Sequence, residues 1–295
     1  MKSLSPARWS AVVAITGIAF LAGCSQSADV PARPLPEKNL SQWTMPLDEY
    51  VYSYTIQSDY AEDLLTSPCM AEKGFDWAVP WRNLDALQSA SYNSIGLRLF
   101  TVELASEFGY HVAPNTDPSA IARMEVVKQN AQISPEEDSA LTACLGVARK
   151  TLPTLPLDAQ NAANYSNDAL DKARASSSVR KAATAWKTCM RPEGVGDLPN
   201  TPDEMPTSGL AQKFGLVGGN DSDSGVTAEE IQIATADAKC QESSGYKQAL
   251  YDEEWRNQVE TMHANADDLA RIYDVLSENR KKVMDVIAEN APIQP

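Results

Sequence analysis

Five cysteines carry the most distinctive chemistry of this chain: Cys24, Cys69, Cys144, Cys189 and Cys240. A thiol can form a disulfide, bind a metal, act as a nucleophile or carry a lipid. The sequence contains no Cys-x2-Cys pair, which argues against a four-thiolate metal site. Cys24 follows an apolar stretch near the N-terminus, whereas the other four are spread through the body of the chain.

Signatures of catalysis are missing from the sequence. The only histidines are His111 and His263, and neither belongs to a His-Glu-x2-His zinc motif. There is no Gly-x-Ser-x-Gly elbow, phosphate-binding loop or dinucleotide fingerprint. We expect both histidines at the surface or in capping positions. We predict no catalytic residue, no metal and no cofactor, which favours a role other than catalysis.

Acidic residues do not change this interpretation. Forty of them make carboxylate pairs unavoidable by chance, so such pairs do not identify a glycosidase. The segment from Asp221 to Gly225 is faintly similar to a calcium loop, but Val226 stands where the loop needs glycine. A solvated acidic loop is the favoured interpretation.

Aromatic residues gather between Trp43 and Trp81, and two of them, Trp77 and Trp81, are candidates for a binding platform. Exposed aromatic side chains can bind glycans or peptides, but aromatic residues are also ordinary core components. The favoured alternative is that both tryptophans pack in the core.

Residues 1–23 are typical of a signal peptide. Lys2 and Arg8 precede an apolar run of about 13 residues, too short for a membrane-spanning helix of roughly 20. The run ends in Leu21-Ala22-Gly23-Cys24, which resembles the lipobox of bacterial lipoproteins. The resemblance implies cleavage before Cys24, diacylglyceryl (palmitate) attachment to its thiol, and anchoring at the extracytoplasmic face of the cell membrane. The alternative is a soluble secreted protein.

Residues 24–44 are expected to form the lipidated cysteine and a flexible tether, since they contain Pro31, Pro34 and Pro36 and few apolar residues. The domain proper is expected over residues 45–295, with possible sub-structures at 45–155 and 165–295. A net charge of −15 repels nucleic acid and anionic lipid, so we expect no nucleic-acid partner and attachment to the membrane through lipid alone.

The four remaining cysteines form an even set in an exported chain, which favours two disulfides. Three connectivities are possible. We prefer Cys69–Cys144 with Cys189–Cys240, because each Cys-Met helix is then joined to a later helix. The alternative is four free buried thiols.

The fold class expected is all-α, because several segments carry both helix start and stop signals. Helices are expected to begin near Ser58, at Asp117-Pro118, at Ser134-Pro135, near Asn167 and at Thr227. Glycine followed by an apolar residue recurs where helices should end, at Gly74, Gly109, Gly194, Gly215 and Gly245.

The C-terminal segment shows the strongest pattern. From Trp255 to Ile287 apolar residues recur in steps of four and three, broken at Arg280, which predicts a long heptad-patterned helix over about 246–290. We expect it to pack on helices of its own domain, with an intermolecular coiled coil as the alternative.

Several short motifs together resemble uncharacterised lipoproteins of actinobacteria. They are Cys69-Met70 with Gly74-Phe75, Phe108-Gly109-Tyr110-His111, Cys189-Met190 with Gly194, and Ala236-Asp237 with Cys240. This chain departs at Pro68 and Pro192, beside the two Cys-Met motifs. The resemblance implies an anchor and disulfides but no known activity.

The function expected is therefore a binding or interaction module of the cell envelope, with an envelope protein or a transporter as its partner. A solute-binding or accessory lipoprotein of a transporter and a cell-wall-modifying enzyme are the alternatives.

Overall fold

The computed structural model describes residues 33–51, 54–85, 100–130, 132–155, 159–217 and 225–294. The expected signal peptide, Cys24, the first part of the tether and the acidic loop at 221–224 lie outside these ranges. Within them every regular element is helical and no strand occurs, which confirms the all-α prediction. Residues 34–295 form one compact unit by their contacts.

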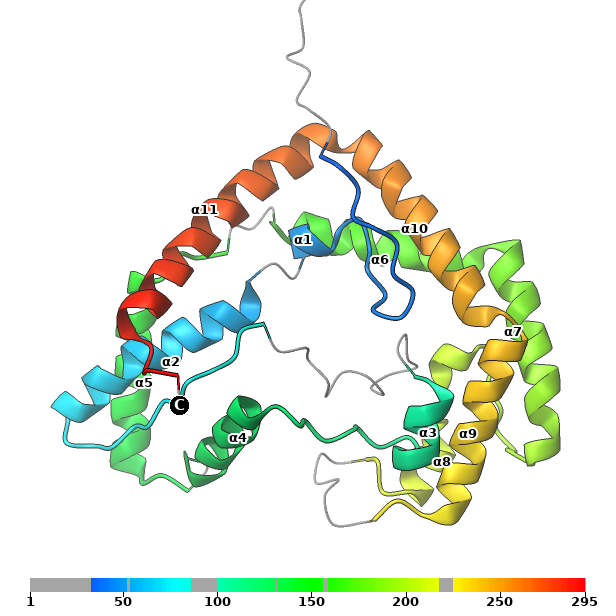
Figure 1. The fold of residues 1–295 in the computed structure, drawn as a ribbon, viewed down its shortest axis with the longest axis horizontal. Coiled ribbons are helices and arrows are strands. Elements are labelled where there is room, and N and C mark those ends of the chain that lie inside the picture. The colour runs from blue at the N-terminus through cyan, green and yellow to red at the C-terminus, as the bar shows by residue number, and fades with distance from the viewer. Residues whose placement is uncertain are drawn as a thin grey trace, which may run out of the picture. The chain divides into compact units, whose positions relative to one another are not determined.

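Figure 1 shows the helices in chain order. They are α1 (Asp48–Val51), α2 (Thr55–Glu72), α3 (Val102–Phe108), α4 (Pro118–Asn130), α5 (Pro135–Thr151), α6 (Ala159–Ala175), α7 (Ser177–Met190), α8 (Ser208–Lys213), α9 (Ala228–Ser243), α10 (Tyr246–Ala264) and α11 (Ala266–Asn290). Short 3-10 turns lie at Arg191–Glu193 and Pro202–Glu204.

Helix starts follow the sequence signals closely. The Ser134 hydroxyl accepts a hydrogen bond from the Glu137 N–H and begins α5, and Thr227 does the same for Glu230 at the start of α9. The sequence predicted both caps. Helix α2 starts at Thr55, three residues before the expected Ser58, and it continues through Pro68.

All five predicted glycine ends adopt positive φ values. At Gly74 the backbone forms a complete Schellman motif, in which the N–H groups of Gly74 and Phe75 bond the carbonyls of Ala71 and Met70. The same pair of bonds occurs around Gly215. Glycine was therefore the most reliable stop signal in this chain.

The helix expected from Asn167 to Cys189 is instead two helices, α6 and α7. Ser176 lies between them with an extended backbone, and its hydroxyl accepts a hydrogen bond from the Val179 N–H at the start of α7. An interior N-cap of this kind competes with helix continuation. Helix α6 also begins earlier than expected, at Ala159.

The long C-terminal helix is present as α11, with 25 residues, but the expected range 246–290 is divided at Asn265. Asn265 has φ −125° and ψ 31°, and its side-chain amide donates to the Thr261 carbonyl. The seam of α11 does not break at Arg280, because Asn279 faces inward instead. The Asn279 amide donates to the Tyr54 hydroxyl and to the Thr154 carbonyl.

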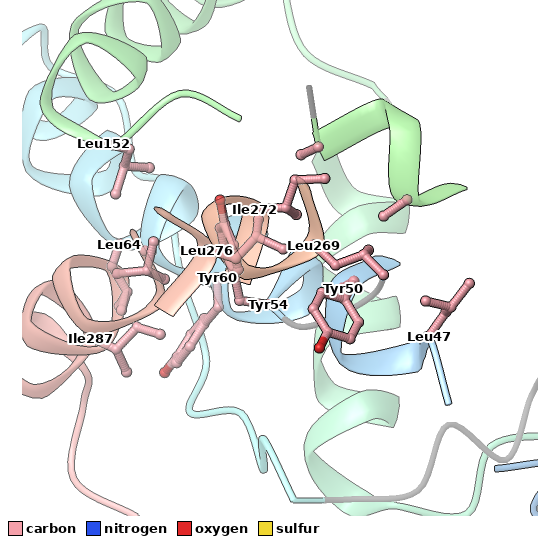
Figure 2. Close-up of a cluster of buried hydrophobic side chains, with 14 residues drawn as sticks. Leu47, Tyr50, Tyr54, Tyr60, Leu64, Leu152, Leu269, Ile272, Leu276 and Ile287 are labelled. Carbon is pink, nitrogen blue, oxygen red and sulfur yellow. The ribbon is translucent and has the colours of Figure 1, made fainter. Parts of the chain in front are cut away.

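Helix α11 packs on its own domain, as predicted, chiefly against α2. Figure 2 shows the core cluster they share: Leu64 of α2 lies toward Ile287 of α11, whereas Leu269, nearer the start of α11, lies on the side of Tyr50. Helix α2 belongs to the expected sub-structure 45–155 and α11 to 165–295, so this contact packs the two against each other.

Residues 38–44, which the sequence analysis assigned to the tether, contact α10. Trp43 is 5% exposed and donates its indole N–H to Glu254, and the Asn39 backbone N–H donates to the Tyr251 hydroxyl. The Tyr251 hydroxyl in turn donates to the Thr44 carbonyl. The domain therefore begins earlier than residue 45.

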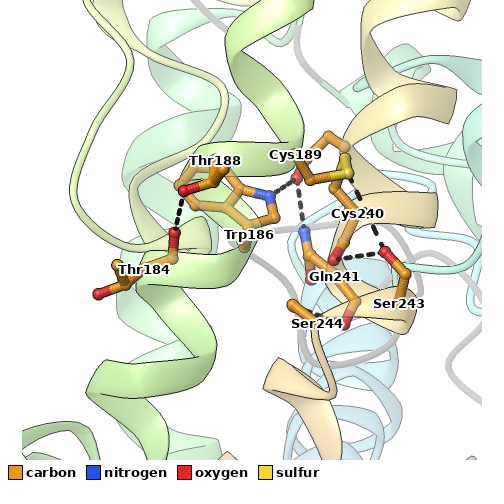
Figure 3. The surroundings of a disulfide bond; sticks show 9 residues. Thr184, Trp186, Thr188, Cys189, Cys240, Gln241, Ser243 and Ser244 are labelled. Atoms are coloured by element: carbon orange, nitrogen blue, oxygen red, sulfur yellow. Dashed lines mark hydrogen bonds between the residues drawn. A yellow bond between two sulfur atoms is a disulfide. The ribbon is translucent and has the colours of Figure 1, made fainter.

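Two disulfides join helix pairs, as predicted. Cys69–Cys144 links α2 to α5, and Cys189–Cys240 links α7 to α9, with Cα–Cα distances of 5.7 and 5.6 Å. Figure 3 shows the second bridge beside Trp186 and Gln241. Both bridges connect elements far apart in the sequence and limit the freedom of the unfolded chain.

Candidate functional site

A cavity of about 360 Å³ lies between α2, residues 77–82 and α4, and we call it the α2–α4 cavity. The volume is at the lower end of the range that small-molecule sites occupy. It is lined by Tyr60, Asp63, Trp77, Ala78, Val79, Pro80, Arg82, Arg123, Val126, Val127 and Asn130.

Helical spacing explains how two walls of the cavity form. Tyr60 and Asp63 are three residues apart on α2 and therefore share a face. On α4, Arg123, Val127 and Asn130 recur at steps of four and three, which also places them on one face.

Hydrogen bonds hold the connecting segment against α2. The Ser67 hydroxyl donates to the Trp77 carbonyl at 2.7 Å. The Arg82 guanidinium donates to the Ile56 carbonyl at 3.3 Å. Because Ser67 and Ile56 lie toward opposite ends of α2, these two bonds fix both ends of the segment 77–82.

The same segment is attached to the start of α4. The Asn83 backbone N–H donates to the Ser119 hydroxyl at 2.9 Å, and its side-chain amide donates to Asp117 at 3.3 Å. Asp117 also accepts from the backbone N–H groups of Ser119 and Ala120, at the first turn of α4. The hydrogen bond from the Ser119 hydroxyl, the largest cause, lowers the pKa of Asp117.

Two guanidinium groups and one carboxylate line the cavity. Arg123 and Asp63 approach to 3.7 Å, and their side chains are 39% and 35% exposed. Burial raises the pKa of Asp63, and the Arg123 charge opposes this shift. Burial lowers the pKa of Arg82, and the neighbouring positive charge of Arg123 lowers it further. The side chains that line the cavity therefore carry one more positive than negative charge, although Asp59 of α2 acts on Arg82 and Asp63 from outside the lining.

Two polar atoms in the cavity lining lack hydrogen-bond partners among the described residues: the Tyr60 hydroxyl and Nε of Arg123. Tyr60 is 2% exposed. Burial raises the pKa of its hydroxyl; the Arg82 backbone N–H lies near enough to oppose that shift but does not reach hydrogen-bond geometry. A buried polar atom without a partner carries a free-energy cost that a bound ligand can relieve.

Of the two tryptophans predicted as binding residues, the structure places Trp77 in the cavity lining and Trp81 outside it. Sequence reasoning missed the two arginines, Arg82 and Arg123. They come from segments that only the fold brings together, and neither lies in a recognisable motif.

A second polar centre is completely enclosed. Asp237 of α9 is 1% exposed and accepts hydrogen bonds from the Trp186 indole, the Gln241 amide and the Tyr110 hydroxyl at 2.8, 3.0 and 3.1 Å. Burial raises its pKa to about 6, although the three hydrogen bonds and Lys247 oppose the shift. Both carboxylate oxygens of Asp237 accept hydrogen bonds and the side chain is buried, so we interpret Asp237 as a structural residue.

His111 was expected at the surface or in a capping position, but its side chain is buried and contacts Glu230 instead. It is 8% exposed, and its Nδ1 lies 2.8 Å from Glu230, which also accepts from the Tyr110 backbone N–H. Glu230 is fully buried, so it needs these partners. The exposed His263 agrees with expectation.

Among the described residues no group of histidine, cysteine and acidic side chains is arranged to hold a metal ion. In the same part of the chain, no helix combines the length and the apolarity needed to cross a bilayer. Comparison with protein-family models, curated proteins and solved structures finds no match to this chain.

Proposed function

We propose that this chain is a lipid-anchored binding protein on the extracytoplasmic face of a bacterial cell membrane. The lipobox-like sequence that ends at Cys24 supports the anchor, and so does the resemblance of short motifs in the rest of the chain to uncharacterised actinobacterial lipoproteins. The two disulfides support an oxidising compartment, because such bonds are rare where thiols are kept reduced.

The α2–α4 cavity is the single observation that supports binding of a small solute. Its wall is fixed by hydrogen bonds from residues 67, 82 and 83, so the site exists before a ligand enters. A pre-formed site loses little conformational entropy on binding. This geometry favours solute binding, as in an accessory lipoprotein of a transporter.

A protein partner is the second candidate, and exposed side chains on α4 favour it. Ile121, Met124 and Val127 are 48, 56 and 53% exposed, although each is a large apolar residue. Apolar residues grouped on one exposed face are typical of interaction surfaces. The third candidate, a cell-wall-modifying enzyme, gains no support from the described residues.

A thermal-shift screen tests the solute-binding function. The full-length protein is heated with pools of organic acids, amino acids, sugars, nucleosides and short peptides. A ligand that binds only the native state raises the melting temperature. At least one compound should do so, and Trp77→Ala should abolish the shift whereas the matched Trp81→Ala should retain it. No shift from any pool, or equal loss in both variants, would count against a solute site in this cavity.

A further inference from the structure

We propose that the α2–α4 cavity binds a small organic monoanion, with its carboxylate between Arg82 and Arg123 and an apolar body against Trp77. This inference rests on the proposed binding function and specifies the class of ligand.

The charges of the side chains that line the cavity favour an anion. Arg82 and Arg123 place two positive charges at the cavity, and Asp63 supplies one negative charge. A ligand with one negative charge balances the charges of the lining, whereas a cation increases the repulsion that Arg82 and Arg123 already exert on each other. Asp59 of α2 adds a negative charge from outside the lining, where it acts on Arg82 and Asp63. Two arginines in one cavity lining are not what the composition of the chain would favour, because its net charge is −15.

The cavity lining also offers hydrogen-bond donors that suit a carboxylate. Each guanidinium carries five N–H groups in a planar fork that matches a carboxylate. Arg123 faces Asp63 only loosely, at 3.7 Å, and its buried Nε has no partner among the described residues. The unpartnered Tyr60 hydroxyl adds a neutral donor to the same cavity. Three different side chains, those of Arg82, Arg123 and Tyr60, therefore have N–H or O–H groups that can bond an acceptor entering the cavity.

The apolar part of the lining favours a ligand with a hydrocarbon body. Trp77, Val79 and Pro80 come from the connecting segment, and Val126 and Val127 come from α4. Sites for small molecules combine such a surface with a few polar groups that fix the orientation of the ligand. An inorganic anion would leave this surface uncovered, so the anion is expected to carry a hydrocarbon body.

Asp63 restricts the ligand further. Its carboxylate repels a second negative charge, which disfavours dianions such as phosphate monoesters. It could bind the ammonium group of an amino acid, but it already faces Arg123. We therefore expect a simple carboxylic acid to bind more tightly than the matching zwitterion.

Calorimetric titration of the full-length protein at pH 7 with four probes tests the proposal. The probes 3-phenylpropionate, 3-phenylpropan-1-ol, L-phenylalanine and 3-phenylpropylamine share one apolar body and differ in charge. The acid should bind at least tenfold more tightly than the alcohol and the zwitterion, and the amine should not bind. Equal affinity for acid and alcohol, or tighter binding of the zwitterion, would overturn the proposal. N-acetyl-L-phenylalanine adds an arm that distinguishes a free acid from the C-terminus of a peptide; binding of either supports the monoanion.

Variants then assign the binding to the cavity. Arg82→Gln and Arg123→Gln should each weaken the acid at least tenfold and leave the alcohol unchanged. Tyr60→Phe, which removes only the hydroxyl, should weaken the acid by a smaller factor. The matched control is Arg180→Gln, an exposed arginine on α7 outside the cavity lining, which should change nothing. An equal effect of Arg180→Gln would mean that net charge rather than the site attracts the acid.

The outcomes separate the two proposals. A neutral compound that binds and depends on Trp77 would refute the monoanion and keep the binding function. Failure of every probe here together with every pool in the thermal-shift screen would refute both. A cooperative thermal unfolding transition without ligand shows that each variant is folded. The titration of the four probes uses the wild-type protein and does not depend on any variant.

Discussion

The Trp186 indole of α7 donates a 2.8 Å hydrogen bond to Asp237 of α9, three residues before the cysteine on each helix that forms the bridge Cys189–Cys240. The polar contact and the covalent bond are thus consecutive links between the same two helices. A residue at i and a residue at i+3 share one helix face, so the sequences Trp-x2-Cys and Asp-x2-Cys define a common register. The Trp186 hydrogen bond therefore fixes the Asp237 carboxylate, and the disulfide three residues along each helix keeps the two helices in that register.

Asp237 should make the stability of the protein fall as the pH rises. Its pKa is raised from 3.8 to about 6 by burial, so the folded state binds this proton more tightly than the unfolded state. The associated stability is complete below about pH 4 and is lost as the pH passes about 6, by about 3 kcal/mol. Urea unfolding between pH 4 and 7.5 should show a shallower decline for Asp237→Asn than for the unmodified protein.

The control for this experiment is Asp274→Asn, an exposed position in the middle of α11. It should leave the pH dependence unchanged. Parallel curves for Asp237→Asn and the unmodified protein would show that Asp237 does not titrate differently in the folded state.

Gly109 should tolerate no side chain. It has φ +59°, and a Cβ atom there would lie 2.5 Å from Oε1 of the buried Glu230. Gly109→Ala should therefore destabilise the fold by about 3 kcal/mol or more, from strain and from displacement of Glu230. Gly194→Ala is the comparison variant, because φ +71° and ψ 19° place it in the left-handed helical region and a Cβ there would meet nothing within 4 Å. It should cost only about 1–2 kcal/mol. At Gly109 the ψ of −127° adds backbone strain of its own. Chemical denaturation of both variants measures the difference, and equal losses would show that Glu230 can move aside.

The two disulfides should be separable by their effect on ligand binding. Each closes a long loop, with separations of 75 and 51 residues, and removal by double Cys→Ala substitution should cost about 4 kcal/mol in either case. Only Cys69–Cys144 belongs to a helix, α2, that lines the α2–α4 cavity. Its loss should weaken ligands of the cavity, whereas loss of Cys189–Cys240 should leave affinity unchanged in the fraction that remains folded.

Peptide mapping without reductant supplies the direct measurement of the pairing. It should recover cross-linked peptides for both pairs. Alkylation of all four thiols without reductant would contradict the assignment, and so would a peptide joining Cys69 to Cys240.

Cys24→Ser should release the protein from the membrane. If the thiol carries diacylglycerol, its loss removes the anchor, because the acidic surface does not attract anionic lipid. Cell fractionation should find the wild-type protein with the membrane and the variant in the soluble fraction. Intact mass should show that the wild-type protein is heavier than the variant by the mass of the lipid. A wild-type protein that already washes free of membranes would contradict the proposal.

Local chemistry predicted the helix ends well, because an N-cap hydroxyl or a glycine at positive φ acts within a few residues. Ser134, Thr227 and the five glycine positions illustrate this. The disulfide pairs were predicted on a different basis, a preference for joining each Cys-Met helix to a later helix, and the structure confirms both pairs.

The breaks at Ser176 and Asn265 were not predicted, because their flanking apolar patterns continue as in a single helix. The burial of His111 was also missed, since its partner Glu230 is 119 residues away in the sequence. For the same reason the cavity could be predicted only in part. Trp77 was predicted as a binding residue because it is aromatic, but no local pattern indicates that Arg82 and Arg123 line the same cavity.

The packing of α2 on α11 sets an order for biosynthesis. Tyr54 and Asn279, which bond each other, are 225 residues apart. The apolar face of α2 therefore leaves the ribosome long before the helix that covers it has been translated, and nascent chains that halt before residue 266 lack that cover altogether. Truncated products should be bound by chaperones or degraded rather than accumulate as folded fragments.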